Sequence, residues 1–375
     1  MNRIVILGSG FAALSTVRGL RAAGVADPVT VVSPRQELVY LPSLIWLPSG
    51  KRSGDDLRVP LAGFFARHDV HWHQGSVQQV RDGGRRVVTD SGELENDFLV
   101  IATGGRYLRR LPGIEHAIIP CEGIGAAESI RDRLAAMDGG TIAVGFATNP
   151  KEPGAVRGGP MFEFLFGIDT LLRQQGRRER FELVFFNPSE QPGQRLGPAA
   201  VAKMLARMRA LNIHTHLGHK PLRFEPDRVV TEGGDFATDL ILFMPGLTGP
   251  AWLDGSDLPL SEGGFVAAEH TCRVRGMERV YVAGDAGSYP GPDWMAKQAH
   301  QADLQAGAVA KNIAAELRGK PAGHGFKAEL ACIVDSLDAG MLVYRSGRRN
   351  LALPRMRGLH WLKQRFEARY LNQYR

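Results

Sequence analysis

The feature that most constrains the fold is a glycine-rich turn near the start of the chain. The apolar run Ile4-Val5-Ile6-Leu7 indicates a buried strand, and residues 14–22 have the apolar spacing of a helix. Between them, Gly8 allows a tight turn, Gly10 lets the backbone approach a pyrophosphate, and Ala13 lets the helix lie close to the strand. The helix N-terminus adds partial positive charge, so the sequence predicts a dinucleotide site here.

The length of the chain and its cysteine content narrow the class of protein. A chain of 375 residues has room for two or three domains with their own cores. No apolar run reaches the roughly 18 residues that cross a bilayer, and the first strand follows residue 1 closely, so we expect a cytoplasmic protein without a signal peptide. Three cysteines do not make a disulfide scaffold, so we expect any functional cysteine to act as a thiol.

The positive charge is concentrated at the C-terminal end. Residues 341–375 contain nine basic residues and one acid, Glu367, which is a net charge of +8. Because the whole chain carries +7, the remainder is close to −1. Such a basic segment suits anionic lipid or nucleic acid, but no nucleic-acid-binding motif accompanies it, so we expect no nucleic-acid partner.

The middle of the chain predicts a second Rossmann-like unit that lacks a phosphate-binding turn. A strand at 140–144 is followed by Gly145-Phe146-Ala147-Thr148-Asn149-Pro150, without the glycine fingerprint. Pro150, Pro153 and Pro160 oppose a tight turn into a helix, and the next helix is expected only at 161–174. We therefore expect no nicotinamide cofactor in this unit.

Later segments return the chain to the first unit. A strand at 280–282 leads to Gly284 and Asp285, and a long helix is expected at 294–318. The predicted fold is α/β, with two Rossmann-like domains of the FAD/NAD(P)-binding type and a basic amphipathic C-terminal segment. The predicted limits are 1–115 for the first part of the first dinucleotide-binding domain, 116–250 for the second Rossmann-like domain, 251–320 for the second part of the first domain, and 321–375 for a C-terminal segment.

Three motifs occur in one order: Gly8-x-Gly10-x-x-Ala13, Ala102-Thr103-Gly104 and Ala283-Gly284-Asp285. Together they resemble the flavoproteins with two dinucleotide-binding domains, which bind FAD. Within this group the chain resembles sulfide:quinone oxidoreductases and the flavoprotein subunit of flavocytochrome c sulfide dehydrogenase. The closer likeness rests on Ser33 with Pro42-Ser43 downstream, the segment Gly159–Phe164, Lys297, and Cys332 within Ala331–Val334.

The resemblance implies FAD as the cofactor, with no metal, and assigns the residues around it. The residues implied to line FAD are Gly8, Gly10, Ala13, Ser33, Arg35, Pro42, Thr103, Gly104, Gly284, Asp285 and Lys297. Lys297 is implied to lie near the pyrimidine side of the flavin, where a cation stabilises the charge of the reduced ring. The residues implied to act in catalysis are Cys332, Cys121, Glu163 and Lys297.

The cysteines depart from the pattern of this group. Cys332 matches one of the two redox cysteines, but the other is missing, because the segment before Gly159 reads Ala155-Val156-Arg157-Gly158. Either Cys121 replaces it, or Cys332 acts alone, or Cys332 is an ordinary buried thiol. Cys272 is predicted to be structural. Gln298, near Lys297, falls where type II NADH dehydrogenases carry a glutamine close to quinone.

The C-terminal segment is predicted to be a basic amphipathic helix. Leu359, Leu362, Phe366 and Tyr370 have helical spacing, while Lys363, Arg365 and Arg369 fall on the other faces. This arrangement suits an anionic membrane surface, as the resemblance also implies; the alternative is packing on the chain itself or on a partner subunit.

The sequence therefore predicts an FAD-dependent oxidoreductase on the inner face of the membrane. It would pass two electrons from sulfide, or a related small sulfur compound, through flavin to quinone. The alternatives are a type II NADH:quinone dehydrogenase-like enzyme, and a flavin-binding relative that has lost sulfide turnover. A homo-oligomer is left open, and the periplasmic relative is disfavoured because no export signal precedes the first strand.

Overall fold

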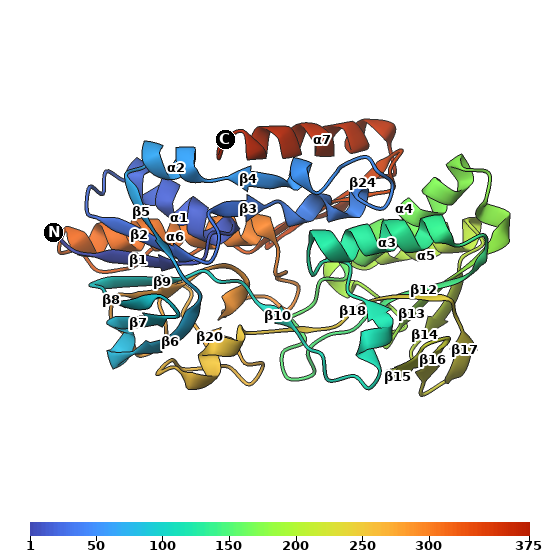
Figure 1. The fold of residues 1–375 in the computed structure, drawn as a ribbon, viewed down its shortest axis with the longest axis horizontal. Helices are drawn as coiled ribbons and strands as arrows, with labels where there is room; N and C mark the ends of the chain where they lie inside the picture. The colour runs from blue at the N-terminus through green and yellow to red at the C-terminus, as the bar shows by residue number, and fades with distance from the viewer.

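A computed structural model describes residues 1–375. Two parallel five-stranded sheets occupy opposite ends of its long axis (Figure 1). The first sheet has the order β21 (Val280–Val282), β9 (Phe98–Ile101), β1 (Ile4–Leu7), β2 (Val29–Ser33) and β5 (Val70–Gln74). The edge strand β21 thus comes from a distant part of the chain. All four residues of β1 are buried, as expected for a central parallel strand.

Helices and a small sheet cover the two faces of the first sheet. The helices α1 (Phe11–Ala22) and α6 (Ala299–Leu317) pack closely, since a Cβ atom added at Gly19 would lie 2.7 Å from the Cβ of Ala310. The opposite face is covered by an antiparallel sheet of β6 (Val77–Arg81), β7 (Arg86–Thr89) and β8 (Gly92–Glu95). The short helix α2 (Ala62–Arg67) precedes β5.

The second sheet repeats this layout. Its order is β11 (Ala117–Ile118), β18 (Leu240–Met244), β12 (Gly140–Phe146), β13 (Phe181–Asn187) and β14 (His214–Leu217), all parallel. Its helices are α3 (Ile124–Ala136), α4 (Gly159–Gln174) and α5 (Pro198–Ala210), and its small antiparallel sheet is β15 (Pro221–Glu225), β16 (Arg228–Thr231) and β17 (Gly234–Ala237). The two Rossmann-like sheets confirm the predicted α/β class.

Short strand pairs connect and edge the two units. They are β3 (Glu37–Val39) with β4 (Arg58–Pro60), β10 (Arg106–Tyr107) with β19 (Leu247–Thr248), and β20 (Val266–Ala267) with β22 (Gly287–Ser288). The pair β10–β19 is antiparallel and lies between the two large sheets in Figure 1. The chain therefore passes between the units twice, side by side.

The C-terminal residues form an antiparallel sheet and a helix. The sheet is β23 (Glu329–Asp335), β24 (Gly340–Ser346) and β25 (Asn350–Ala352), followed by α7 (Arg357–Leu371). In Figure 1, α7 runs along the top of the molecule, from above β24 toward α2. Its far end is anchored by Tyr374, which is fully buried with its ring 5.3 Å from that of Phe64. The helix thus packs along the body of the protein.

Two expectations about the C-terminal third are corrected by the structure. The long helix begins at Ala299 rather than at residue 294, because the backbone is extended at Gln298. In α7, Leu359 and Tyr370 are buried whereas Leu362 and Phe366 are exposed, so this apolar stripe lies along the boundary between the packed and the solvent-facing sides of the helix. Lys363 is also buried, in an ion pair with Glu163, and is not an outward-facing cation. The partner that draws Lys363 inward is remote in the sequence.

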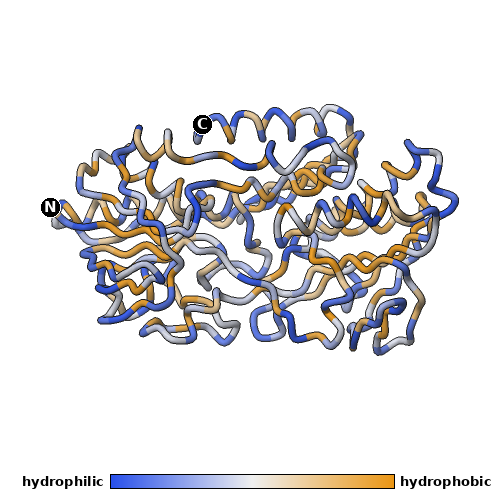
Figure 2. The backbone as a smooth tube through the Cα atoms, viewed as in Figure 1, coloured by the Kyte–Doolittle hydropathy of each residue, from blue (hydrophilic) through white to orange (hydrophobic).

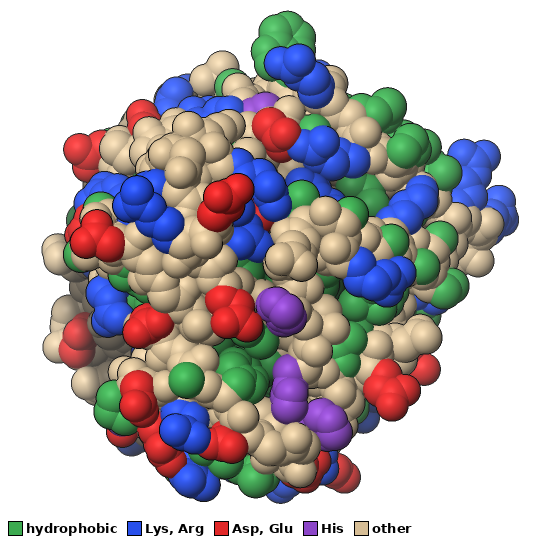
Figure 3. Space-filling model, turned by 90° about the vertical axis from the view of Figure 1, so that its right-hand side faces the viewer, with side chains coloured by type: hydrophobic (Ala, Val, Ile, Leu, Met, Phe, Trp, Pro, Cys, Tyr) green, Lys and Arg blue, Asp and Glu red, His purple; other side chains and the backbone are tan.

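The distribution of polarity follows this architecture. The most hydrophobic stretches of the backbone are the strands of the two parallel sheets (Figure 2). Basic and acidic side chains are interspersed over the end face formed by the second unit (Figure 3). No helix combines the length and the apolar composition needed to span a bilayer.

Candidate active site

The turn between β1 and α1 has the geometry of an anion-binding turn. Gly8 has a φ of +105°, and a Cβ atom added there would lie 2.5 Å from the carbonyl oxygen of Ala102, so only glycine fits. Gly10 has nothing within 4 Å of an added Cβ atom, which leaves its backbone open to a ligand. No side chain caps α1, and no acid stands in its first turn. The first N–H groups of this helix therefore face outward without an intrahelical acceptor.

The other two motifs meet this turn at the same edge of the sheet. β9 and β21 are neighbours of one another, and β9 pairs with β1, so all three turns follow the carboxyl ends of adjacent parallel strands. A Cβ atom added at Gly284 would lie 3.2 Å from the Cβ of Ala12 in α1. Thr103 follows β9, and its hydroxyl is buried without a hydrogen-bond partner. An unpartnered buried hydroxyl beside an open glycine turn fits a ligand rich in phosphates and hydroxyls, such as FAD.

The residues after β2 are arranged differently. The buried hydroxyl of Ser33 donates to the carbonyl of Arg35 at 2.9 Å and accepts from the indole of Trp72 at 3.1 Å. The side chain of Arg35 is exposed and pairs with Glu37 at 2.8 Å. Pro42 is the second residue of the short 3₁₀ helix η1 (Leu41–Trp46). The structure thus places these three residues without bringing their side chains together, and their predicted contacts with FAD stay predictions.

Asp285 is the centre of a buried group of charges. It forms an ion pair with Arg157, which also donates to the hydroxyl of Tyr107 at 3.3 Å. Lys297 donates to the carbonyl of Gly287 at 2.6 Å and to that of Asp285 at 3.3 Å. Burial lowers the pKa of Lys297 to about 8, although the charge of Asp285 opposes this. Two cations therefore stand at the edge where the three motifs meet.

Cys121 and Cys332 belong to the same region although they are remote in sequence. Cys121 is buried after β11, and Cys332 lies in β23 and packs against the same hydrophobic cluster. Burial raises the pKa of each thiol to about 12. Arg157 lowers the pKa of Cys121, and within the net rise of both pKa values the carboxylate of Glu163 raises each and the ammonium of Lys363 lowers each. Both sulfur atoms therefore lie within electrostatic reach of one ion pair.

The remaining thiol lies elsewhere. Cys272 is fully buried in the core of the first unit, and burial alone raises its pKa. No charged group contributes to that shift. Its predicted structural role stays a prediction.

Glu163 and Gln298 both contact β23, the strand that carries Cys332. Glu163 is buried in α4 and accepts a hydrogen bond from the backbone N–H of Asp335 at 2.9 Å. Gln298 donates to the carbonyl of Glu329 at 3.1 Å, and His300 lies 3.1 Å from the Glu329 carboxylate. Glu163, the acid predicted near the sulfur, and Gln298, the amide predicted near the quinone, thus contact opposite ends of β23.

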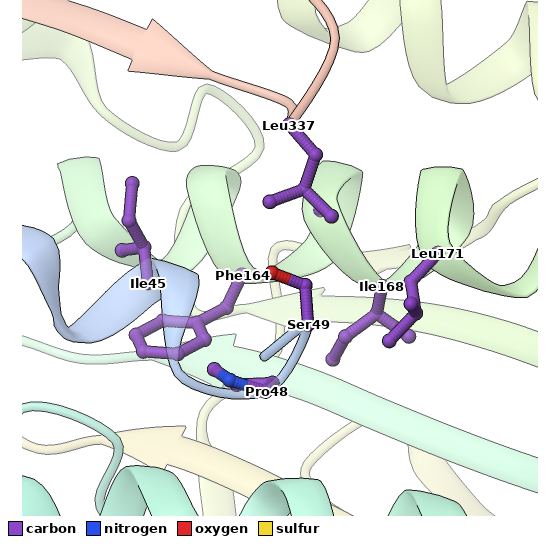
Figure 4. A pocket seen from close by; sticks show the side chains of 8 residues that line it. Ile45, Pro48, Ser49, Phe164, Ile168, Leu171 and Leu337 are labelled. Atoms are coloured by element: carbon purple, nitrogen blue, oxygen red, sulfur yellow. The ribbon is translucent and has the colours of Figure 1, made fainter. Parts of the chain in front are cut away.

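An apolar contact lies beside Glu163. Ile45, Phe164 and Leu337 come from η1, α4 and the turn after β23, and their side chains surround a small depression (Figure 4). The depression is too small for more than a water molecule. This packing keeps solvent away from the buried side of α4.

Sequence reasoning passed over two residues that the structure places at the site. The sequence distinguishes the segment of Arg157 only by its lack of cysteine, and the ion pair of Arg157 with Asp285 joins residues 128 positions apart. For Lys363 the sequence predicts a surface cation of the basic C-terminal segment. The sequence offered a signal only for Arg157, a charged residue in the segment where a cysteine was expected; the helical pattern placed Lys363 on a polar face and gave no sign of its burial.

The architecture and this site define a class of protein. Residues 2–306 match the pyridine nucleotide-disulphide oxidoreductase family, so the chain belongs to that family, and it is an FAD-dependent oxidoreductase. Over 360 residues the chain is 24% identical to the sulfide-quinone reductase of Aquifex aeolicus (strain VF5). The matched region covers 90% of this chain and 82% of that protein. A further relative is the ferredoxin–NAD(+) reductase subunit of a Pseudomonas putida benzene 1,2-dioxygenase system, 26% identical over 47% of this chain and 45% of that one.

Solved structures show the same fold. The sulfide:quinone oxidoreductase of the hyperthermophilic bacterium Aquifex aeolicus has a TM-score of 0.87 at 21% identity and covers 100% of this chain and 92% of its own. NDH2 of Plasmodium falciparum, solved with NADH, has a TM-score of 0.76 at 12% identity, covering 100% and 96%. These findings confirm the resemblance to sulfide:quinone oxidoreductases that the motifs indicated.

Proposed function

We propose that this flavoenzyme oxidises sulfide, or a related small sulfur compound, and reduces a quinone. The observation that carries the proposal is the position of Cys121 and Cys332, which share one buried cluster and one ion pair. In the overall reaction HS⁻ gives up two electrons and a proton to become zero-valent sulfur. Quinone takes up two electrons and two protons to become quinol, so one further proton is consumed. FAD, when bound, supplies the two-electron acceptor between these half-reactions.

The charges around Asp285 support an anionic donor. Arg157 and Lys297 are both largely enclosed. Asp285 pairs with Arg157, and the charges of Glu152 and Arg195 also act on Lys297, so three cations face two carboxylates and the group has one cation in excess. A low-dielectric site of this sign attracts HS⁻ or a persulfide. We propose that Gly8, Gly10, Thr103 and Asp285 hold the FAD while Cys332 takes up the sulfur.

The exposed face of α7 supports peripheral attachment to the inner face of an anionic membrane. Trp361, Leu362 and Phe366 expose 64%, 50% and 57% of their surface. The guanidinium of Arg365 lies 5.6 Å from the centre of the Trp361 ring, on the same exposed side. Large apolar side chains beside arginines suit the interface of an anionic bilayer, which is also where a quinone is available.

One experiment tests the electron donor directly. Sulfide is added without oxygen to the oxidised, flavin-loaded protein, and flavin absorbance is followed. Bleaching at a rate that depends on sulfide concentration is expected. The Cys332→Ser variant should lose on the order of a hundredfold or more in this rate, as when a nucleophile is removed. Cys272→Ser, which alters a thiol outside the site, is the matched control and should bleach as the unaltered protein does.

A second candidate function is supported by one specific observation. Arg157 stands in the segment where this group of proteins has its other redox cysteine, and burial disfavours the thiolate at both remaining positions. A relative that binds FAD but no longer turns over sulfide would have this arrangement. Absence of bleaching by sulfide in a protein that chemical reductants do bleach would reject the first proposal and favour this one.

A further inference from the structure

A buried ion pair joins the C-terminal helix to α4 beside the strand of Cys332. The ammonium of Lys363 contacts the carboxylate of Glu163 and donates at 3.1 Å to the carbonyl of Ile333, the residue after Cys332. The side chain of Lys363 is only 15% exposed and that of Glu163 only 6%. The helix that presents tryptophan and phenylalanine to solvent therefore turns a lysine inward, toward the thiol.

The surroundings of Lys363 hold this ammonium in place. On β23, the carboxylate of Asp335 accepts from the indole of Trp46 at 3.1 Å and lies 2.6 Å from a ring nitrogen of His360. His360 in turn contacts Lys51. The charged and titratable groups facing this region are Glu163 from α4, Asp335 and Cys332 from β23, His360 from α7, Lys51 from the segment after η1, and, nearer Cys121, Arg157.

The charges favour a cationic Lys363. Burial alone would lower its pKa, but the carboxylates of Glu163 and Asp335 and the thiol of Cys332 outweigh burial and raise it. Among these groups, Lys363 is the cation that lowers the pKa of Cys332, whereas burial and Glu163 raise it. Formation of a negatively charged sulfur at Cys332 therefore depends on the charge that α7 supplies.

We propose that Lys363 is a positioning residue for the sulfur chemistry, and that its ammonium stabilises an anionic sulfur, thiolate or persulfide, at Cys332. In forming the thiolate, the S–H bond breaks and the proton passes to a base from solvent, while Lys363 keeps its own protons. The C-terminal helix thereby contributes a charged side chain to the site, between α4 and β23. The inference rests on the role proposed for Cys332, but its test does not require sulfide turnover.

The test measures the reactivity of Cys332 in the flavin-loaded protein. After reduction with a phosphine, alkylation by iodoacetamide is followed at each cysteine by mass spectrometry across a range of pH. Lys363→Met should slow alkylation of Cys332 about tenfold at each pH below its pKa, the effect of a one-unit rise. Glu163→Gln, which keeps a hydrogen-bond acceptor for Lys363, should accelerate it by a similar factor. Lys363→Arg should restore most of the unaltered rate.

The two substitutions are expected to change the alkylation rate of Cys332 in opposite directions, and this distinguishes an electrostatic role of Lys363 from a structural one. If α7 only shields the thiol, both substitutions loosen the helix, and alkylation accelerates in both variants, which would overturn the inference. Unchanged rates in both would overturn it as well. Arg357→Met removes an exposed cation from the first turn of the same helix and should leave the rate at Cys332 unaltered. If Lys363→Met does not fold, Lys363→Gln is measured in its place, and an unaltered or accelerated rate at Cys332 in that variant overturns the proposal.

The outcome is independent of the fate of the proposed function. Suppose that Lys363→Met slows and Glu163→Gln accelerates alkylation of Cys332, but sulfide does not bleach the flavin. The role of Lys363 is then retained, and sulfide is rejected as the electron donor. Bleaching by sulfide together with unshifted alkylation would retain the donor and reject the role of Lys363.

Discussion

At the scale of single residues, Gly8 is the position where the backbone itself forms the cofactor site. An alanine at this position would need a φ of +105° and would place its Cβ atom 2.5 Å from the Ala102 carbonyl oxygen. The turn must open to relieve that contact, and this displaces the N–H groups of α1. We expect Gly8→Ala to be purified without flavin absorbance and to take up little added FAD.

A second glycine provides the control for this substitution. Gly50 also has a positive φ, +70°, but an added Cβ atom would meet nothing within 4 Å. Gly50→Ala should therefore show only the backbone strain, on the order of 1–3 kcal/mol, as a lower unfolding temperature with flavin retained. Equal flavin content in both variants would contradict the role of the first turn.

The lowered pKa of Lys297 predicts how the stability of the flavin-free protein depends on pH. Its pKa is lowered by burial from 10.5 to about 8, so the folded flavin-free protein holds fewer protons there than the unfolded chain between these two values. Stability contributed by this site is therefore constant below about pH 8 and rises from pH 8 toward 10.5. The unfolding temperature of the unaltered protein, relative to Lys297→Met, should increase across that window.

The control for this measurement is a lysine in solvent. Lys320 is exposed at the end of α6, so Lys320→Met should give a difference in unfolding temperature that does not change with pH. A difference for Lys297→Met that falls as pH rises would mean that the folded state favours the charged lysine, contrary to the burial described here.

At the scale of elements, α7 has two faces with different chemistry. The inner face carries His360, Lys363 and Glu367, each bonded to the body of the protein, and Arg52 binds Glu367 at 2.6 Å. The outer face carries the aromatic and aliphatic side chains that a soluble helix normally buries. Polar side chains face the protein and apolar side chains face outward. We therefore expect α7 to stay docked on the protein while its outer face enters a membrane interface.

Vesicle binding tests this assignment. Against anionic vesicles, Arg365→Gln with Arg369→Gln should weaken binding roughly 30-fold, from about 1 kcal/mol per cation, and this loss should shrink at high salt. Trp361→Ser with Phe366→Ser should weaken binding at any salt concentration, because apolar contact is lost. Glu122→Gln, which changes an exposed carboxylate paired with Arg109, is a surface control that should bind normally. Failure of the unaltered protein to bind anionic vesicles would contradict the proposal.

At the scale of the whole molecule, the second unit has the layout of a dinucleotide-binding domain without its phosphate turn. The chain leaves β12 through a loop rather than a helix, and Asn149 in that loop donates to the carbonyls of Leu247 and Gly263 at 2.9 and 3.0 Å. A Cβ atom added at Gly246 would lie 2.2 Å from the N atom of Asn149, so the loop is packed tightly against the next segment. The loop occupies the position at which a helix N-terminus would bind phosphates.

This packing predicts that NADH is not an electron donor. Without oxygen, NADH should leave the flavin absorbance unchanged over a period in which a chemical reductant such as dithionite bleaches it fully. Stoichiometric bleaching by NADH would contradict the prediction and favour the alternative of an NADH:quinone dehydrogenase. The relatives that use NAD, by their names, do not bear on this chain, because they share with it a fold at low identity or only part of its length.

The fold was predictable from sequence where local pattern and burial agree. The strands β1, β9 and β18 are apolar at every position because both faces of a parallel sheet are covered, and the turns after β1 and β9 contain the small residues that close approach requires. The three motifs therefore predicted neighbouring turns. The surroundings of Lys363 and Arg157 were not predictable, because each is fixed by a carboxylate 200 and 128 positions away, respectively. Helical periodicity assigns Lys363 to solvent, and the irregular segment of Arg157 has no periodicity from which its burial could be predicted.

The strand order of the first sheet has a consequence for how the protein is made. β9 pairs on one side with β1 and on the other with β21, which emerges from the ribosome only after the entire second sheet has been translated. A nascent chain that has folded its first hundred residues therefore carries an open, wholly apolar edge at Phe98–Ile101. Synthesis that pauses before residue 280 would leave that edge available to other chains, so slow translation of the middle third should favour aggregation over holoenzyme.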